Sequence, residues 1–145
     1  MPINRSLIDD RLLIARLVGE RIRLPRAGLL TTTYWYYRAC RAAVVGGSGQ
    51  LSGPFARLAA DEQAAAIGAM LVLPDDITLP DPRVLVPEMV TIHQRHPQLN
   101  LMNVEAVAAA GVFEARVLLS SRAAEGILPH VLDAEGLAWK VIEVG

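Results

Sequence analysis

The stretch from Leu99 to Ser121 constrains the fold of this chain more than any other part of the sequence. Its first half is an alanine-rich apolar run at helical spacing, and its second half, residues 116–120, is a leucine and valine run without polar alternation. Gly111 offers a break between the two halves. An alanine-rich helix lets a sheet approach closely, and an unbroken apolar strand is typical of a parallel sheet covered on both faces. The pattern predicts a helix, a turn and a buried strand, which together make half of a βαβ unit.

The composition limits the class of protein. The chain has 145 residues, of which 52% are hydrophobic, a formal net charge of −1 at pH 7 and a mean hydropathy of +0.33. This length suits one domain over residues 1–145 with a real core. The near-zero charge gives no overall attraction to nucleic acid, and with no apolar run of membrane-spanning length we expect no membrane association. The single cysteine, Cys40, excludes an intramolecular disulfide and fits a reducing cytoplasm, where we expect this protein.

The N-terminal segment can be interpreted in two ways. Ser6 and Asp9 have the spacing of a capping box, which predicts a helix that ends near Gly19. The competing interpretation makes residues 3–8 a first strand with Asp9 at its C-terminal edge. Because Asn4, Arg5 and Ser6 are poor strand residues, the helix is preferred.

Periodicity and turn residues predict the other elements. The predicted strands are residues 28–32, 71–74 and 138–144, and the predicted helices are residues 34–45, 52–58, 62–70, 83–96 and 125–132. Thr32 or Thr33 can cap the first of these helices, and Asp61 and Asp81 can cap two others. The glycine-rich residues 45–50 read as a loop, which has neither a P-loop lysine nor the dinucleotide-binding pattern. The alternation of strands and helices predicts an α/β three-layer sandwich with a mainly parallel central sheet flanked by helices.

Four adjacent aromatic residues, Tyr34 to Tyr37, precede Arg38 on one predicted helix. Four neighbours cannot share one helical face, so we expect two to pack inward and two to cover the sheet edge or a partner subunit. The alternative is a surface on which bases stack while Arg38 and Arg41 bind phosphates, which the neutral overall charge disfavours. This crowding, together with the apolar composition, predicts a homodimer.

Four short motifs accompany this order of elements, namely Thr31-Thr32 opening a helix, His96-Pro97 ending one, Asn103-Val104-Glu105-Ala106 entering the alanine-rich helix, and Val117 to Ser121 after it. Together they resemble the PIN domain family. The resemblance covers nearly the whole chain and is best over residues 83–144. It implies a PIN-like fold in which three or four carboxylates at the carboxyl edge of the sheet hold Mg²⁺ or Mn²⁺, which activates water against an RNA phosphodiester.

The sequence departs from this family at the acidic positions. In chain order, the four positions fall on Asp9 beside Asp10, on Arg38, on Asn103 two residues before Glu105, and on Ser120, Ser121 and Arg122. A guanidinium beside a divalent cation repels it. We therefore expect Asp9 or Asp10 to pair with Arg38 where the family would hold a metal.

Two functions follow from this resemblance. The preferred hypothesis is a non-catalytic PIN-like module, without metal or cofactor, that binds a protein partner, itself or RNA. Its cleft residues would be Thr32, Arg38, Asn103, Ser120, Ser121 and Arg122. The alternative is a Mg²⁺- or Mn²⁺-dependent single-stranded RNA endonuclease of toxin–antitoxin type, with Asp9, Asp10 and Glu105 as candidate catalytic residues. Binding of a divalent ion would discriminate between the two.

Overall fold

The computed structural model describes residues 4–45 and 53–144, and these residues form a five-stranded sheet flanked by helices. The strands are β1 (Ser6–Ile8), β2 (Leu29–Leu30), β3 (Ile77–Thr78), β4 (Arg116–Leu119) and β5 (Trp139–Val141). The helices are α1 (Asp10–Val18), α2 (Thr33–Val45), α3 (Gly53–Ala56), α4 (Ala60–Leu71), α5 (Pro82–Arg95), α6 (Leu101–Val112), α7 (Ser121–Ala124) and α8 (Leu128–Ala134). From residue 46 on, the predicted glycine-rich loop lies outside the described residues.

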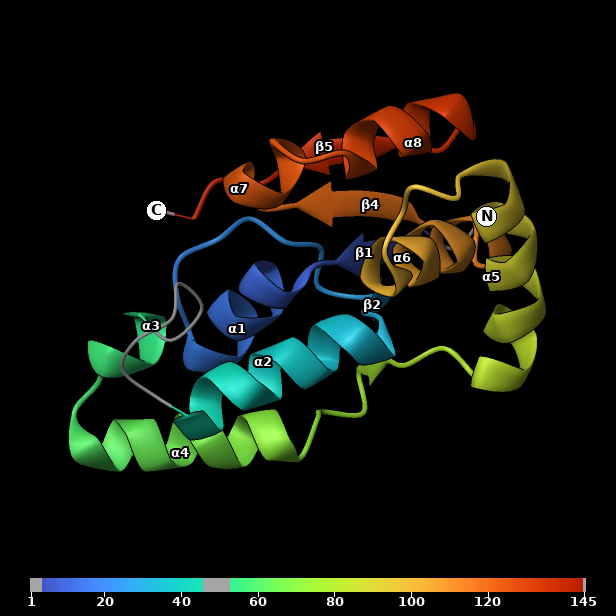
Figure 1. Cartoon of the computed structure of the whole chain (residues 1–145). Helices are drawn as coiled ribbons and strands as arrows, with labels where there is room; N and C mark the ends of the chain where they lie inside the picture. The colour runs from blue at the N-terminus through green and yellow to red at the C-terminus, as the bar shows by residue number, and fades with distance from the viewer. Residues whose placement is uncertain (1–3, 46–52, 145) are drawn as a thin grey trace.

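The sheet is parallel throughout, with the strand order β3-β2-β1-β4-β5. One face packs on α5, α6 and α8, and the other on α1, α4 and the greater part of α2. Figure 1 shows α1, α2 and α4 gathered on one side of the strands, with α7 and α8 beside β5 at the other end of the sheet. The predicted three-layer α/β sandwich is confirmed.

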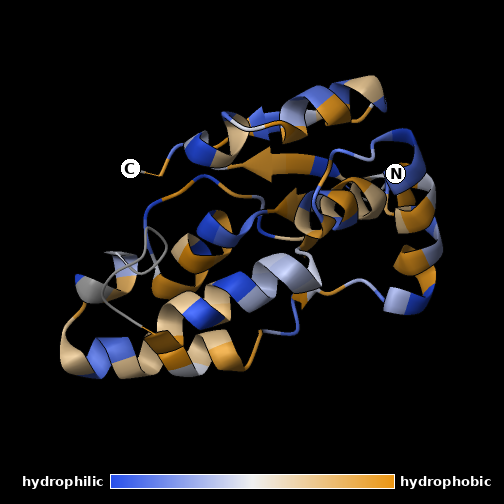
Figure 2. Ribbon diagram, viewed as in Figure 1, coloured by the Kyte–Doolittle hydropathy of each residue, from blue (hydrophilic) through white to orange (hydrophobic). Residues whose placement is uncertain are grey.

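The core strands are apolar on both faces, as a doubly covered parallel sheet requires. Val117 and Leu119 of β4 point into the cluster under α6, while Leu118 points into the cluster under α1, and all three are fully buried. Figure 2 shows β1 and most of β4 as hydrophobic ribbon, with a hydrophilic start to β4. The alanines of α6 let that helix lie close to the sheet, so the stretch from Leu99 to Ser121 does organise the fold.

The preferred interpretation of the N-terminal segment is wrong, because Ser6–Ile8 is the central strand. Ser6 pairs with Leu29 on one side and Arg116 on the other, and its amide donates to the Gly28 carbonyl at 2.9 Å. Asp9 follows the strand and caps α1 by accepting from the Leu12 amide at 2.9 Å. The strand forms because it pairs with β2 and β4. Both partners are distant in sequence, so local strand propensity carries no information about them. The predicted helix end is confirmed at Gly19, which is left-handed at φ 80°.

The predicted third strand at residues 71–74 is also wrong. Leu71 ends α4, and Val72 is 77% exposed, so this β-prone run has no partner strand. The third strand lies at Ile77–Thr78, where both residues pair with β2. Contact with β2 at this edge of the sheet decides the strand position, and the hydrophobicity of residues 71–73 does not.

Several helix boundaries also differ from the prediction. Helix α4 starts at Ala60 with Ala59 as its N-cap, so Asp61 lies in the first turn instead of capping. The helix predicted at 125–132 starts later, as α8 at Leu128, and the short helix α7 that precedes it was not predicted. Helix α6 continues through Gly111 to Val112, and β5 is shorter than the predicted strand. Helix α5 is confirmed, with the Asp81 side chain accepting from the Arg83 amide at 2.9 Å.

The aromatic cluster divides as predicted, with two residues inside and two outside. Trp35 is buried, and the hydroxyl of the part-buried Tyr36 donates to the Met70 carbonyl at 2.9 Å. Tyr34 and Tyr37 are 43% and 60% exposed. In the described part of the chain, no helix is long and apolar enough to cross a membrane.

The Glu135 carboxylate, which we call the carboxylate clasp, links the end of α8 to the end of α5. Glu135, just after α8, accepts from Arg95 Nη2 at 2.6 Å and lies 2.9 Å from His96 Nε2. The Arg95 guanidinium and His96 lower the pKa of Glu135. This clasp fixes the position of α8, whose first residue, Leu128, lines the cleft described next.

Candidate functional site

The carboxyl edge of the sheet collects the polar residues that the sequence singles out. Because β1, β2 and β4 are parallel neighbours, the residues that follow them meet at one edge. Asp9 and Asp10 follow β1, Thr31 and Thr32 follow β2, and Ser120 follows β4. Thr31 links the end of β2 to the end of β1, since its hydroxyl donates to the Ile8 carbonyl at 2.8 Å.

Asp9 is fully buried, and its carboxylate is used by the protein itself. Its Oδ1 accepts from the Leu12 amide at 2.9 Å, and its Oδ2 accepts from the Ser120 amide at 2.9 Å and the Ser120 hydroxyl at 2.7 Å. Burial, with a smaller contribution from the charge of Asp10, raises the pKa of Asp9 from 3.8 to about 6, against the effect of these hydrogen bonds. Asp9 therefore joins β1, α1 and the end of β4.

Asp10 forms the ion pair that the sequence predicts. Arg38 Nε on α2 donates to Asp10 Oδ2 at 2.7 Å, and the Arg11 amide donates to Asp10 Oδ1 at 2.8 Å. The Asp10 side chain is 11% exposed and that of Arg38 is 46% exposed, so the pair lies at the mouth of a cleft. Sequence reasoning left Asp9 and Asp10 as equal candidates, and the structure assigns the pair to Asp10 because Asp9 points inward.

Glu105 has a separate role at the start of α2. Its two carboxylate oxygens accept from the Thr33 and Tyr34 amides at 3.1 and 2.9 Å. These amides belong to the first turn of α2, where no intrahelical acceptor is available. Thr32 caps the same helix, since its hydroxyl oxygen accepts from the Trp35 amide at 3.0 Å. Glu105 and Thr32 are buried and support α2 without lining the cleft.

A cavity of about 490 Å³ opens between these elements. Of the predicted site residues, Asp10, Arg38, Asn103, Ser120, Ser121 and Arg122 line it. The remaining lining residues are Arg11, Trp35, Met102, Ala123, Gly126, Ile127, Leu128 and Val144. The cleft therefore combines a polar rim, built after β1 and β4, with an apolar wall supplied mainly by α6, α7 and α8.

The charged groups of the cleft are mostly cationic. Arg38 is paired with Asp10, and Arg11 is paired with Glu20 through two hydrogen bonds of 2.7 and 3.0 Å. Arg122 is exposed, and its side chain forms no hydrogen bond or ion pair with the described residues. The cleft thus presents one unpaired guanidinium, which can bind an anionic group of a ligand.

Sequence reasoning missed Arg11 and did not say which of the four aromatic residues would line the cleft. Arg11 directly follows Asp10, so the end of β1 could have indicated it. The apolar wall of Met102, Leu128 and Val144 carried no local signal, because three separate segments supply it.

The residues present do not fit a divalent metal ion. All six oxygens of Asp9, Asp10 and Glu105 already accept hydrogen bonds from protein donors. Among the described residues, no group of three or more histidine, cysteine, aspartate or glutamate side chains could hold a metal. A hard cation needs several oxygen ligands that are free to coordinate it, whereas this edge offers Arg38 and Arg122.

Comparison with known proteins identifies a structural relative. No family model matches the sequence, and no curated protein matches it. Among solved structures, the chain is similar to one in the 2.2 Å structure of VapBC-1 from nontypeable Haemophilus influenzae, with a TM-score of 0.55 over 94% of this chain and 96% of that chain. The identity is 11%, so the likeness concerns the fold. This chain has a PIN-like fold.

The raised pKa of Asp9 predicts how stability depends on pH. The folded protein binds a proton at Asp9 more readily than the unfolded chain does. The free energy of unfolding should therefore fall as pH rises from about 4 to about 6, by roughly 3 kcal/mol from this group for a shift of about two units. In Asp9→Asn, which cannot ionise, this component should vanish. Urea unfolding of both proteins at several pH values measures the difference, and a difference that does not change with pH would contradict this assignment.

The Arg38–Asp10 pair predicts an energetic coupling. Arg38→Met should destabilise the protein because it leaves the mostly buried Asp10 carboxylate without its guanidinium, and the double variant with Asp10→Asn should cost less than the sum of the single changes. Since Arg38 is nearly half exposed, we expect a coupling of about 0.5–1 kcal/mol. A thermal or urea double-mutant cycle measures it. Arg41→Met combined with Asp10→Asn is the matched control and should be additive.

Proposed function

We propose that this protein is a non-catalytic PIN-like interaction module whose cleft binds an anionic group of its partner. One observation carries the proposal: each carboxylate that could have bound a metal accepts hydrogen bonds from protein donors. Arg38, at a position where the PIN family carries an acid, is the residue that donates to Asp10. The nuclease chemistry of the PIN family depends on several free carboxylates around a hard cation. In this cleft those groups hold the fold together instead.

The composition of the cleft supports a ligand that is anionic at one end and apolar beside it. Arg122 offers an unpaired guanidinium with Ser121 and Asn103 nearby, and Met102 and Leu128 offer an apolar wall. A phosphodiester next to a base has this character, and so has a carboxylate next to an apolar side chain. RNA and a protein partner are therefore the two ligand classes that we propose for this cleft, and we propose the cytoplasm as its location.

The alternative is a Mg²⁺- or Mn²⁺-dependent single-stranded RNA endonuclease of toxin–antitoxin type. It is favoured by the placement of Asp10 and Asn103 on the same cleft, directly after β1 and on α6. In this alternative, Arg38 would leave Asp10 when a metal ion enters. The repulsion between a guanidinium and a divalent cation, and the use of Asp9 by Ser120, both oppose that rearrangement.

Metal titration and an RNA cleavage assay test the proposal. We expect no saturable heat when Mg²⁺ or Mn²⁺ is titrated into the purified protein, and no cleavage of a single-stranded RNA oligonucleotide in the presence of either ion. Asp9→Asn, Glu105→Gln and the exposed control Glu125→Gln should then behave alike. Metal-dependent cleavage that disappears in Asp9→Asn or Glu105→Gln but survives in Glu125→Gln would replace the proposal with the nuclease.

A homodimer is a second part of the proposal. Tyr34 and Tyr37 lie three residues apart on α2 and stay largely exposed, which is unusual for aromatic side chains outside an interface. Light scattering should give about twice the 15.7 kDa chain mass at micromolar concentration. Tyr37→Asp should shift the protein toward the monomer, whereas Arg26→Asp, at an exposed position outside α2, should not. A wild-type monomer at micromolar concentration would exclude the dimer.

A further inference from the structure

A second cationic surface lies away from the cleft. We call it the arginine surface and define it by Arg5, Arg21, Arg23, Arg26, Arg116 and Lys140, all of which are exposed. None of these residues lines the cavity at the carboxyl edge of the sheet. The net charge of −1 for the whole chain therefore hides a local excess of positive charge.

The segment between α1 and β2 supplies three of these arginines. It has no helix or strand, and its burial alternates, with Arg21 and Arg23 exposed while Ile22 and Leu24 are partly buried. Leu24 packs against the core cluster that contains Leu118. Figure 1 shows this segment leading from the end of α1 back to the start of β2. The apolar side chains fix the segment on the core, so the arginines point outward.

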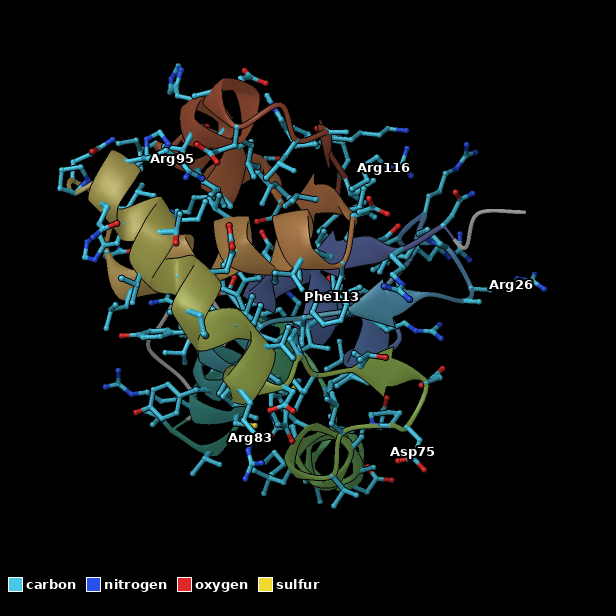
Figure 3. All side chains as sticks on the ribbon, turned by 90° about the vertical axis from the view of Figure 1, so that its right-hand side faces the viewer. Arg26, Asp75, Arg83, Arg95, Phe113 and Arg116 are labelled. Atoms are coloured by element: carbon cyan, nitrogen blue, oxygen red, sulfur yellow. The ribbon has the colours of Figure 1, made fainter. Side chains whose placement is uncertain are left out.

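The sheet register places the other cations beside this segment. Arg116 opens β4 and pairs with Ser6, and its amide donates to the Arg5 carbonyl at 3.0 Å, so Arg5 and Arg116 are neighbours at the amino edge of the sheet. Lys140 pairs with Leu118, two residues after Arg116, and therefore lies on the same face of the sheet as Arg116. Figure 3 shows Arg26 and Arg116 reaching out on the same side of the molecule.

The protein does not neutralise these cations. The ion pairs among the described residues use Arg11, Arg16, Arg38, Arg95 and His96, and none uses a residue of the arginine surface. The Arg5 guanidinium lies 5.7 Å from the centre of the Phe113 ring and donates to the Phe113 carbonyl at 3.5 Å.

Acids are also present at this edge, but they are fewer. Glu114 lies in the turn before β4, and Asp75 and Asp76 precede β3, where Asp76 pairs with Arg16. Glu20, directly before Arg21, pairs with Arg11, so four acids accompany the six cations of the arginine surface and two of those acids are already paired.

We propose that the arginine surface binds the phosphate backbone of a nucleic-acid duplex without reading its sequence. Guanidinium groups match phosphate geometry, and a row of cations along a segment beside a sheet edge can follow a backbone with regularly spaced charge.

The lack of apolar and aromatic exposure favours a duplex over other polyanions. None of the large apolar side chains exposed by the described residues belongs to β1, β4, β5 or the segment between α1 and β2. A protein partner normally needs an apolar interface centre, whereas nucleic-acid interfaces are polar and strongly cationic. Single-stranded nucleic acids are typically held by stacking on exposed aromatic rings, which this surface does not offer.

Fluorescence anisotropy with labelled probes tests the proposal. The probes are a short mixed-sequence DNA duplex, an RNA duplex of the same length, one of the single strands, and a polyglutamate peptide. If about four phosphates are contacted, affinity for the DNA duplex should fall on the order of a hundredfold between 50 and 200 mM salt. The triple variant Arg21→Gln, Arg23→Gln, Arg116→Gln should weaken duplex binding at least tenfold at low salt. The two duplexes separate DNA from RNA as the source of the phosphates.

The matched control removes the same amount of charge elsewhere. Arg41, Arg57 and Arg83 are exposed, lie outside the arginine surface and form no ion pair with described residues. The triple variant of these three to glutamine should bind the duplex within about twofold of wild type. Equal losses in both triple variants, no duplex binding, or tighter binding of the single strand or of polyglutamate would each overturn the proposal. Arg122→Gln, which alters the cleft alone, should leave duplex binding unchanged, so this result is independent of the proposed function of the cleft.

Discussion

The buried carboxylate of Asp9 is the interaction on which the functional edge of this protein depends. It accepts hydrogen bonds from the first turn of α1 and from both the amide and the hydroxyl of Ser120 after β4. A single side chain thereby joins the central strand, the helix that leaves it and the end of the neighbouring strand. Charge buried to this extent is costly, and the raised pKa of Asp9 expresses that cost. The edge tolerates it because both carboxylate oxygens of Asp9 accept hydrogen bonds from protein donors.

The placement of Asp9 leaves Asp10 to define the charge of the cleft. Asp10 faces outward and meets Arg38, so its carboxylate is neutralised, and Arg11 is similarly balanced by Glu20. Arg122 then remains as the unpaired charge. We therefore propose that this cleft binds an anionic group directly through Arg122, without a metal between the protein and the anion. Fold alone does not determine activity, because activity belongs to the side chains that a fold positions.

The two edges of the parallel sheet carry different polar chemistry. At the carboxyl edge the acids are buried or paired and the cleft has both polar and apolar walls. At the amino edge, Arg5 and Arg116 remain exposed beside the segment that carries Arg21 and Arg23. Because all strands run in one direction, residues that precede strands and residues that follow strands are separated by the length of the sheet. The two binding surfaces that we propose are therefore built from different residues.

The sequence by itself determined the α/β class, the buried β4, the alanine-rich α6, the capped α5 and the division of the aromatic cluster, because each depends on local periodicity or on a capping residue. It also identified most polar residues of the cleft, since these directly follow strands or open helices. Tertiary structure alone decided that Ser6–Ile8 is a strand, that the third strand is Ile77–Thr78, and that Asp10 instead of Asp9 meets Arg38. These outcomes depend on partners that are distant along the chain, and local propensity contains no information about a partner that only folding brings near.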